Sequence, residues 1–341
     1  MKPPPDNLKI GLVNDNAVAC EAIRRLLAGR SGYDLLWIAY DGQEAVDHTI
    51  KEPPDVILMD IIMPRMNGVE ATRRIVASTG CAILLVTSSI HNNTSKVFEA
   101  MGAGALDVVT TPSEGNTSEI DAFFRKIQQI KTLRAPVATQ RSQLSPPPGK
   151  ATSGSQNLLL LGASAGGPAA LSTILSHLPT NLRAGIVIAQ HMDVRFGDHF
   201  IAWLADQTDW TVRKAVAGDR VEDGVALVAG PEHHLVFRPG NLLHCTDEPS
   251  FAYIPSVNVL FSSAATHWKG PAAAALLTGM GSDGAEGLKQ LRDAGHLTLA
   301  QDAATSALYG MPKAAAAIGA AMEVLALDTI ATRLAGFVSQ N

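Results

Sequence analysis

The stretch Leu158-Leu-Leu-Leu-Gly-Ala-Ser-Ala-Gly-Gly-Pro168 contains an apolar run, a glycine-rich turn and the expected start of a helix. Four consecutive leucines are typical of a strand buried on both faces, as in a parallel sheet covered by helices. The glycines adopt backbone angles that other residues resist, so the chain can turn sharply after the strand. This pattern predicts a βα unit with Ser164 at the edge of a parallel sheet.

Apolar runs of strand length recur after this stretch. The spacing predicts strands at 158–161, 184–190, 226–229, 272–277 and 297–300, and a hairpin at 236–244 with Pro239-Gly240-Asn241 at its turn. Alternation of strands and helices predicts a doubly wound α/β domain in the second half of the chain.

The first half shows five similar repeats. Strands are expected at 9–13, 35–39, 55–59, 82–86 and 107–109, and helices at 17–27, 42–49, 69–77, 96–101 and 120–133. Apolar strands that alternate with helices predict a second parallel sheet covered on both faces.

The segment 134–156 changes in character, because proline, serine and glycine replace the apolar runs. We expect a flexible linker there. The chain of 341 residues then contains two domains, 1–133 and 157–341.

Composition excludes several classes of protein. A net charge of -5 and a pI of about 6.0 argue against a nucleic-acid-binding surface. Three scattered cysteines indicate a reduced, cytoplasmic protein, and the N-terminus lacks the apolar core of a secretory signal. The uncharged segment 151–182 is interrupted by glycines and a proline, so we expect no membrane insertion.

Three polar residues follow predicted strands of the first domain: Asp15, Asp60 and Thr87. The carboxyl ends of parallel strands are where open α/β sheets bind ligands. Two carboxylates there suit Mg²⁺, and a carboxylate beside Mg²⁺ can accept a phosphoryl group. Each residue alone could simply cap its strand, and the combination of three favours a site.

Residues 8–112 resemble a response-regulator receiver domain, on the stretch Asp55-Val-Ile-Leu-Met-Asp-Ile-Ile-Met-Pro-Arg-Met-Asn-Gly-Val-Glu70. The resemblance implies a flavodoxin-like (βα)5 fold, Asp60 as phosphoacceptor and Thr87 as the phosphate-sensing hydroxyl. It also implies Mg²⁺ as cofactor, bound by Asp15, Asp60 and Ile62.

Two positions depart from the receiver family. Asn14-Asp15 replaces the usual acidic pair, and Thr111 stands where the family has a lysine before Pro112. The cation that normally pairs with the phosphate is therefore absent, so we expect phosphorylation of Asp60 to activate the esterase more weakly than in relatives with the lysine.

In the second domain, Gly162 and Gly166 flank Ser164 in a G-x-S-x-G pattern, which is typical of a serine nucleophile but occurs by chance. His191 follows a predicted strand and is the expected base, although it could be only a polar residue leaving a strand. Asp283 is the candidate for orienting the base, and Asp302 is its rival.

Residues 157–325 resemble the catalytic domain of protein-glutamate methylesterases of the CheB type. The matching motifs, in chain order, are Gly162-Ala-Ser-Ala-Gly-Gly167, Gln190-His-Met192, Pro255-Ser-Val257, Leu277-Thr-Gly-Met-Gly-Ser-Asp-Gly284, Ala300-Gln-Asp302 and Gly310-Met-Pro312.

The resemblance implies a Rossmann-like domain with a β-hairpin, Ser164 as nucleophile, His191 as general base and Asp283 as its orienter. It implies the Met280 N–H as an oxyanion donor. Ala165 replaces a usual threonine and Asn258 a usual aspartate. The chain looks most like the Wsp-type branch, which adapts a surface-sensing receptor array.

The implied function is phosphorylation-regulated hydrolysis of glutamate γ-methyl esters on chemoreceptors, with glutamine deamidation as a second reaction. The implied partners are methylated chemoreceptor cytoplasmic helices and a CheA-type histidine kinase, with no cofactor for the esterase step. Two alternatives remain: a receptor-docking regulator with an inert esterase domain, and a nucleotide-binding oxidoreductase, which the lack of G-x-G-x-x-G spacing disfavours.

Overall fold

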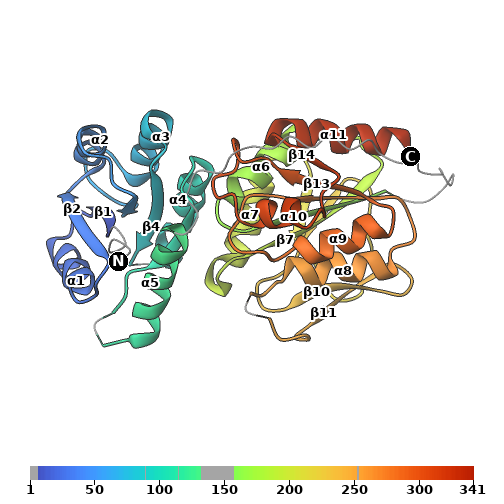
Figure 1. The fold of residues 1–341 in the computed structure, drawn as a ribbon, viewed down its shortest axis with the longest axis horizontal. Helices are drawn as coiled ribbons and strands as arrows, with labels where there is room; N and C mark the ends of the chain where they lie inside the picture. Colours follow the sequence, from blue (N-terminus) through green and yellow to red (C-terminus); the bar gives the residue numbers. More distant parts are fainter. Residues whose placement is uncertain (1–6, 89, 114, 132–156, 252) are drawn as a thin grey trace, which may run out of the picture. The chain divides into compact units, whose positions relative to one another are not determined.

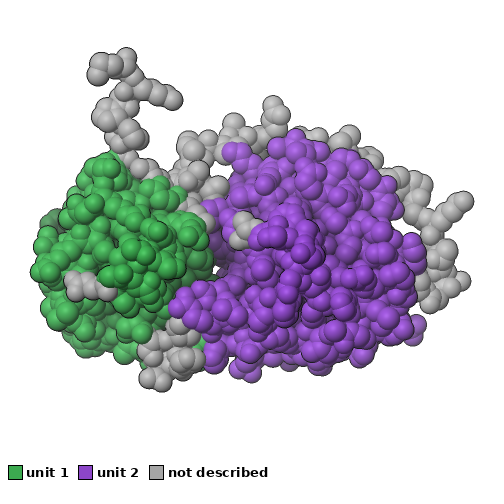
Figure 2. All heavy atoms as spheres, turned by 90° about the horizontal axis from the view of Figure 1, so that it is seen from below, with its two compact units in different colours: residues 1–135 green, residues 136–341 purple. Residues whose placement is uncertain are grey.

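The structure is a computed structural model that describes residues 7–88, 90–113, 115–131, 157–251 and 253–341. The chain divides into two compact units, Met1–Ala135 and Pro136–Asn341 (Figure 2). The expected linker, 134–156, lies outside the described residues. Among the residues that are described, no helix combines the length and apolar character needed to cross a bilayer.

Unit 1 contains one five-stranded parallel sheet in the order β2-β1-β3-β4-β5. Its strands are β1 (Leu8–Val13), β2 (Tyr33–Ala39), β3 (Val56–Met59), β4 (Ala82–Thr87) and β5 (Asp107–Thr110). The order reverses direction beside β1, so the ends of β1 and β3 flank a topological switch point, where such sheets bind ligands.

Helices cover both faces of this sheet. They are α1 (Ala17–Ala28), α2 (Gly42–Lys51), α3 (Gly68–Thr79), α4 (Ile90–Gly102) and α5 (Thr117–Lys131). Figure 1 shows α1 and α5 on one face and α2, α3 and α4 on the other. Side chains of Asn16, Asp41 and Asn67 cap the first turns of α1, α2 and α3, which explains where these helices begin.

Unit 2 contains a seven-stranded parallel sheet in the order β14-β13-β12-β6-β7-β9-β8. Its strands are β6 (Asn157–Ala163), β7 (Ala184–Gln190), β8 (Thr211–Lys214), β9 (Val225–Val228), β12 (Ala272–Leu276), β13 (Leu297–Gln301) and β14 (Glu323–Leu325). A separate antiparallel hairpin is formed by β10 (His234–Arg238) and β11 (Leu242–Thr246).

The helices of unit 2 are α6 (Gly167–His177), α7 (Gly197–Asp206), α8 (Val257–His267), α9 (Ala285–Asp293), α10 (Met311–Ala317) and α11 (Leu327–Gln340), with a short 3-10 helix η1 (Val194–Phe196). Helix α6 contacts α7 and α11, whereas α9 contacts α8 and α10. The two groups cover opposite faces of the sheet (Figure 1). The prediction of two parallel-sheet α/β domains, the second with a hairpin, is confirmed.

The core under α8 and α9 explains how the hairpin is held. Phe237 of β10 and Leu243 of β11 are buried in the same cluster as Phe261 of α8 and Leu288 of α9. Trp268 packs edge-on against Phe237, with ring centroids 5.7 Å apart. The hairpin is therefore attached through α8 to the central strands, and its first residue lies near the site described next.

Candidate active site and phosphorylation site

Ser164 directly follows β6, the central strand of unit 2. Its N–H donates to the Thr278 carbonyl oxygen at 3.0 Å, and its own carbonyl oxygen accepts from the Gly167 N–H at 2.8 Å. Gly166, with φ of 74°, starts α6 in the left-handed region, where an added Cβ would lie 2.6 Å from that of Ala307. The turn that presents Ser164 therefore requires this glycine.

His191 directly follows β7, the neighbouring strand. The pairing of Ala163 with Gln190 places His191 beside Ser164 at the same sheet edge, and the His191 N–H donates to the Ala163 carbonyl oxygen at 3.0 Å. Its Nε2 lies 2.7 Å from Asp283 Oδ2, whereas its Nδ1 is buried and has no hydrogen-bond partner among the described residues. The Tyr253 ring stacks on the imidazole, with centroids 4.7 Å and planes 7° apart.

Asp283 lies in the loop between β12 and α9, and its carboxylate accepts four hydrogen bonds. Besides His191, the donors are the Ser256 hydroxyl at 2.8 Å, the Val257 N–H at 2.7 Å and the Asn258 N–H at 3.0 Å. Burial acts to raise the pKa of the Asp283 carboxyl, but these bonds and His191 outweigh it, so the pKa lies below its usual value.

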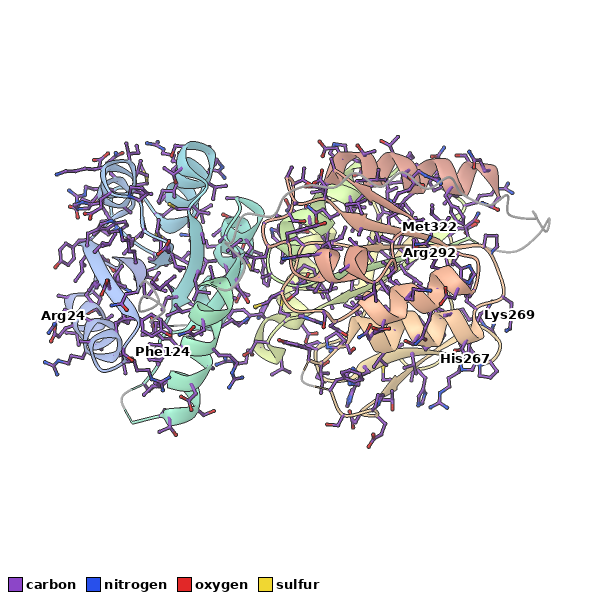
Figure 3. The ribbon with its side chains drawn as sticks, viewed as in Figure 1. Arg24, Phe124, His267, Lys269, Arg292 and Met322 are labelled. Carbon is purple, nitrogen blue, oxygen red and sulfur yellow. The ribbon has the colours of Figure 1, made fainter. Side chains whose placement is uncertain are left out.

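Helix α8 supports this carboxylate electrostatically. Two of the four donors are amides of its first turn, where the helix dipole favours negative charge. Figure 3 shows Lys269 just beyond the opposite end of the helix, where a cation complements the dipole. The N-terminus of α8 therefore binds the Asp283 carboxylate in the same way that helix N-termini bind anions.

The loop after β12 approaches the serine closely. A Cβ added to Gly279 would lie 2.7 Å from that of Ser164, and the Gly279 carbonyl oxygen accepts from the Gly310 and Met311 N–H groups, each at 3.0 Å. Met280 follows directly and is half-buried. Its predicted role as oxyanion donor is compatible with this location and stays a prediction.

Sequence reasoning missed several supporting residues. The Gln190 amide donates to the carbonyl oxygens of Ser164 and His191, both at 2.8 Å. The Thr278 hydroxyl donates to the Ala165 carbonyl oxygen at 3.0 Å. The motifs around Gln190 and Thr278 were part of the family resemblance, and this was the signal that could have identified them.

Three further sequence expectations concern the periphery of the site. Asp302, the rival of Asp283, accepts from the N–H and hydroxyl of Thr305, so the residue that bonds to His191 is Asp283. Ala165 offers no hydroxyl, and Thr278 supports the turn instead. Asn258 Oδ1 accepts from the Gly287 N–H at 2.9 Å and thereby joins α8 to α9.

In unit 1, Asp15 and Asp60 follow β1 and β3, which pair at Val13 and Met59. The Asp60 N–H donates to the Val13 carbonyl oxygen at 2.9 Å. Burial raises the pKa of Asp60 to about 6; the Ile61 and Ile62 N–H groups lower it, and the charge of Asp15 raises it further. Two carboxylates that repel each other here fit a hard divalent cation.

The remaining predicted receiver residues lie around this edge. Thr87 ends β4 and is buried, and its carbonyl oxygen accepts from the Thr111 N–H at 3.0 Å. Ile62 follows Asp60 by two residues, and an isoleucine offers a metal only its main-chain carbonyl. Asn14 is buried and its Oδ1 accepts from the Asn16 N–H at 2.8 Å, so it supports the start of α1.

A parallel sheet with an acidic edge, followed by an α/β unit with serine, histidine and aspartate near one edge, defines a response regulator with a hydrolase-type output domain. Residues 10–120 match the response regulator receiver domain, and residues 159–334 match the CheB methylesterase family. The chain belongs to the CheB methylesterase family.

Similar proteins support this assignment. The protein-glutamate methylesterase/protein-glutamine glutaminase 3 of Pseudomonas aeruginosa is 47% identical over 96% of this chain and 99% of its own length. The protein of the same name from Burkholderia orbicola is 49% identical over 96% of this chain and 97% of its own length. The crystal structure of the Thermotoga maritima CheB methylesterase catalytic domain matches 53% of this chain and 98% of its own, at 30% identity and a TM-score of 0.51.

Proposed function

We propose that this protein hydrolyses glutamate γ-methyl esters on chemoreceptor helices, releases methanol, and deamidates receptor glutamines at the same site. The observation that carries the proposal is the imidazole of His191, a residue that lies beside the strand end bearing Ser164. It bonds to Asp283 through Nε2, while its Nδ1 is buried and finds no partner in the part of the chain that the structure describes. A buried ring nitrogen without a partner needs a donor, and a serine hydroxyl supplies one.

The tautomer follows from this arrangement. A carboxylate accepts, so His191 Nε2 carries the proton and Nδ1 carries the lone pair. Nδ1 is then the general base, whereas Nε2 has this role in the triad of chymotrypsin-like proteases. Asp283 stabilises the imidazolium that forms when Nδ1 takes the proton from Ser164.

The reaction then has two steps. Ser164 Oγ attacks the ester carbon, Nδ1 of His191 takes the hydroxyl proton and returns it to the departing methoxide, and methanol leaves. Water attacks the resulting acyl-enzyme with His191 again as base, which restores the serine and frees the glutamate. The Met280 N–H would stabilise the oxyanion, a role usually worth about 3 kcal/mol of the barrier.

The receiver domain controls the activity of the esterase domain. We assign Asp60 as phosphoacceptor, with Mg²⁺ held by the carboxylates of Asp15 and Asp60 and the Ile62 carbonyl oxygen. When bound, the metal neutralises charge on the transferring phosphoryl group. Thr87 would turn its hydroxyl towards the phosphate, and Thr111 offers at most a neutral hydrogen bond where relatives have a lysine.

The partners follow from the family. We propose a CheA-type histidine kinase as phosphodonor and methylated cytoplasmic receptor helices as substrate, which places the enzyme in the cytoplasm. Within the family we propose that the protein belongs to the Wsp-type branch, because Val13-Asn14-Asp15 stands at the end of the first strand and Thr111 replaces the usual lysine. Adaptation of a surface-sensing receptor array would then be its physiological role.

Methanol release from methylated receptor tests the proposal. Ser164→Ala should lower the rate by at least about 1000-fold without changing the fold, and Asp283→Asn should be milder. Ser176→Ala removes an exposed hydroxyl on α6 and serves as the matched control. Substantial activity in Ser164→Ala would refute the nucleophile; receptor binding without methanol release by the wild type would identify an inert docking regulator.

A further inference from the structure

His234 is a buried polar residue that the mechanism above does not use. It is the first residue of β10, and its side chain is fully buried. Its Nδ1 accepts a hydrogen bond from the Ser256 N–H at 2.9 Å, and the Phe251 ring lies edge-on to the imidazole with centroids 6.2 Å apart. A nitrogen that accepts carries no proton, so His234 is neutral with its proton on Nε2.

Ser256 connects this histidine to the site. It is fully buried and caps α8, because its Oγ accepts from the Val259 N–H at 3.3 Å. A hydroxyl has a single proton to donate, and that of Ser256 goes to Asp283 Oδ1. His234, Ser256, Asp283 and His191 therefore form one continuous chain of hydrogen bonds from the hairpin to the catalytic imidazole.

The His234 contact determines where Ser256 lies. The Ser256 N–H precedes α8 and has no intrahelical acceptor, and the residue is buried from water. Without the imidazole, this N–H would be left unsatisfied, and the turn would rotate to find another acceptor. Any such rotation moves the hydroxyl and the two α8 amides that hold Asp283.

We propose that His234 is a positioning residue that acts through Ser256 to hold the Asp283 carboxylate in the orientation that aligns His191. The inference rests on the proposed function. It assigns the hairpin a task in catalysis, because β10 brings the acceptor to the first turn of α8.

A matched pair of substitutions tests it in the full-length protein. His234→Asn and His234→Leu have nearly the same shape, but only the asparagine keeps an acceptor near the position of Nδ1. We expect His234→Leu to lower kcat for methanol release about 10- to 100-fold with KM changed by less than about threefold, and His234→Asn to recover most of the loss. His233→Leu is the control, because His233 is exposed and bonds to Asp247.

The path through Ser256 is tested separately. Ser256→Ala removes the hydroxyl but keeps the N–H that bonds to His234, so it should lower kcat. Adding His234→Leu should then cost less than it does in the wild type, because the hydroxyl is already gone and only the two α8 amides can still be displaced. Equal activity of the Asn and Leu variants, or losses that multiply in the double variant, would overturn the inference. Should His234→Leu not fold, full kcat in Ser256→Ala would overturn it as well. Each of these failures would leave wild-type methanol release, and its loss in Ser164→Ala, unaffected.

Discussion

At the scale of single residues, the Asp283 carboxylate is fully determined by its surroundings. Oδ1 accepts from the Ser256 hydroxyl and the Asn258 N–H, and Oδ2 accepts from His191 and the Val257 N–H. Four donors leave the group no freedom to rotate. The negative charge is therefore in place before the imidazolium forms, which is the preorganisation that favours the transition state.

The neutral state of His234 predicts a dependence of stability on pH. Burial lowers the pKa of His234, and the Pro249 main chain together with the charges of Asp283 and Asp247 offsets this only in part. The folded pKa then lies below that of the unfolded chain, about 6.5, so unfolding takes up protons as the pH falls. The stability from neutral His234 is complete above about pH 6.5 and is lost as the pH drops towards the folded pKa.

Urea unfolding at pH 7.5 and 5.5 measures this effect. His234→Asn keeps an acceptor but does not titrate, so we expect its free energy of unfolding to fall less between the two pH values. The difference should stay below about 1.4 kcal/mol, because pH 5.5 lies only one unit below the pKa of a histidine in the unfolded chain. Identical pH dependence in both proteins would show that His234 does not titrate in this range.

The sequence indicated that the candidate site residues lie at one sheet edge, but it did not indicate their contacts. Ser164 and His191 each follow an apolar run, and the ends of adjacent parallel strands meet at one edge. The nitrogen that His191 directs to Asp283 could not be predicted, because it depends on where α8 lies. His234 could not be identified either, since its partner Ser256 belongs to a different element.

At the scale of elements, the loop after β12 approaches the turn after β6 closely. A Cβ on Gly279 would lie 2.7 Å from that of Ser164 and 2.4 Å from Met311 Sδ. The methionine side chain can move, but the serine Cβ is attached to a hydrogen-bonded turn. Gly279→Ala should therefore displace Ser164 and lower kcat by at least about tenfold while the protein still folds.

Gly336→Ala is the control for this prediction. Gly336 lies in α11, an added Cβ there meets nothing within 4 Å, and alanine favours a helix over glycine. Its activity should equal that of the wild type, measured by methanol release. Unchanged activity in Gly279→Ala would show that the loop yields without moving the serine.

The elements that sequence reasoning missed share a physical cause. Strands β8 and β14 have four and three residues and lie at the two edges of the sheet. Their side chains are largely half-exposed, so neither shows an apolar run. Helix α4 begins at Ile90, earlier than the expected 96, because the sequence His-Asn-Asn-Thr-Ser that follows Ile90 has no apolar periodicity.

At the scale of the whole molecule, the question is how the receiver controls the esterase. Thr111 follows β5, and its N–H donates to the Thr87 carbonyl oxygen, so it lies at the same sheet edge as the residue proposed to sense the phosphate. A lysine would supply a charge-assisted contact where threonine supplies a neutral one. Thr111→Lys should therefore increase the stimulation of methanol release by a small-molecule phosphodonor with Mg²⁺.

Asp60→Ala and removal of Mg²⁺ are the controls. Both should abolish the stimulation and leave basal activity unchanged. Stimulation that persists in Asp60→Ala would refute the phosphoacceptor. No stimulation in the wild type would indicate that docking regulates the enzyme instead.

Cleavage between the domains gives a second prediction at this scale. The segment Pro146-Pro-Pro148 lies outside the described residues, and the resemblance implies that an unphosphorylated receiver inhibits the esterase. Coupling between sites is typically 5- to 150-fold, so the fragment 157–341 should exceed the full chain within that range. Equal methanol release by the two would show that the receiver does not inhibit.

The two-domain plan was predictable from the sequence, whereas the strand order of unit 2 was not. Apolar runs indicate which segments are strands, but β12 and β7 become the neighbours of β6 through long crossovers. Which strands pair depends on how the intervening helices pack, and no local pattern encodes this.

That strand order has a consequence for synthesis of the protein on the ribosome. Strand β6 is made before β12, its partner on one side, and the hairpin and α8 are made between them. Until residue 272 has emerged, one edge of a strand rich in leucine has no partner, and such edges invite aggregation. Because Asp283 is made later still, we expect no nascent chain to hydrolyse an ester before nearly the whole protein has been translated.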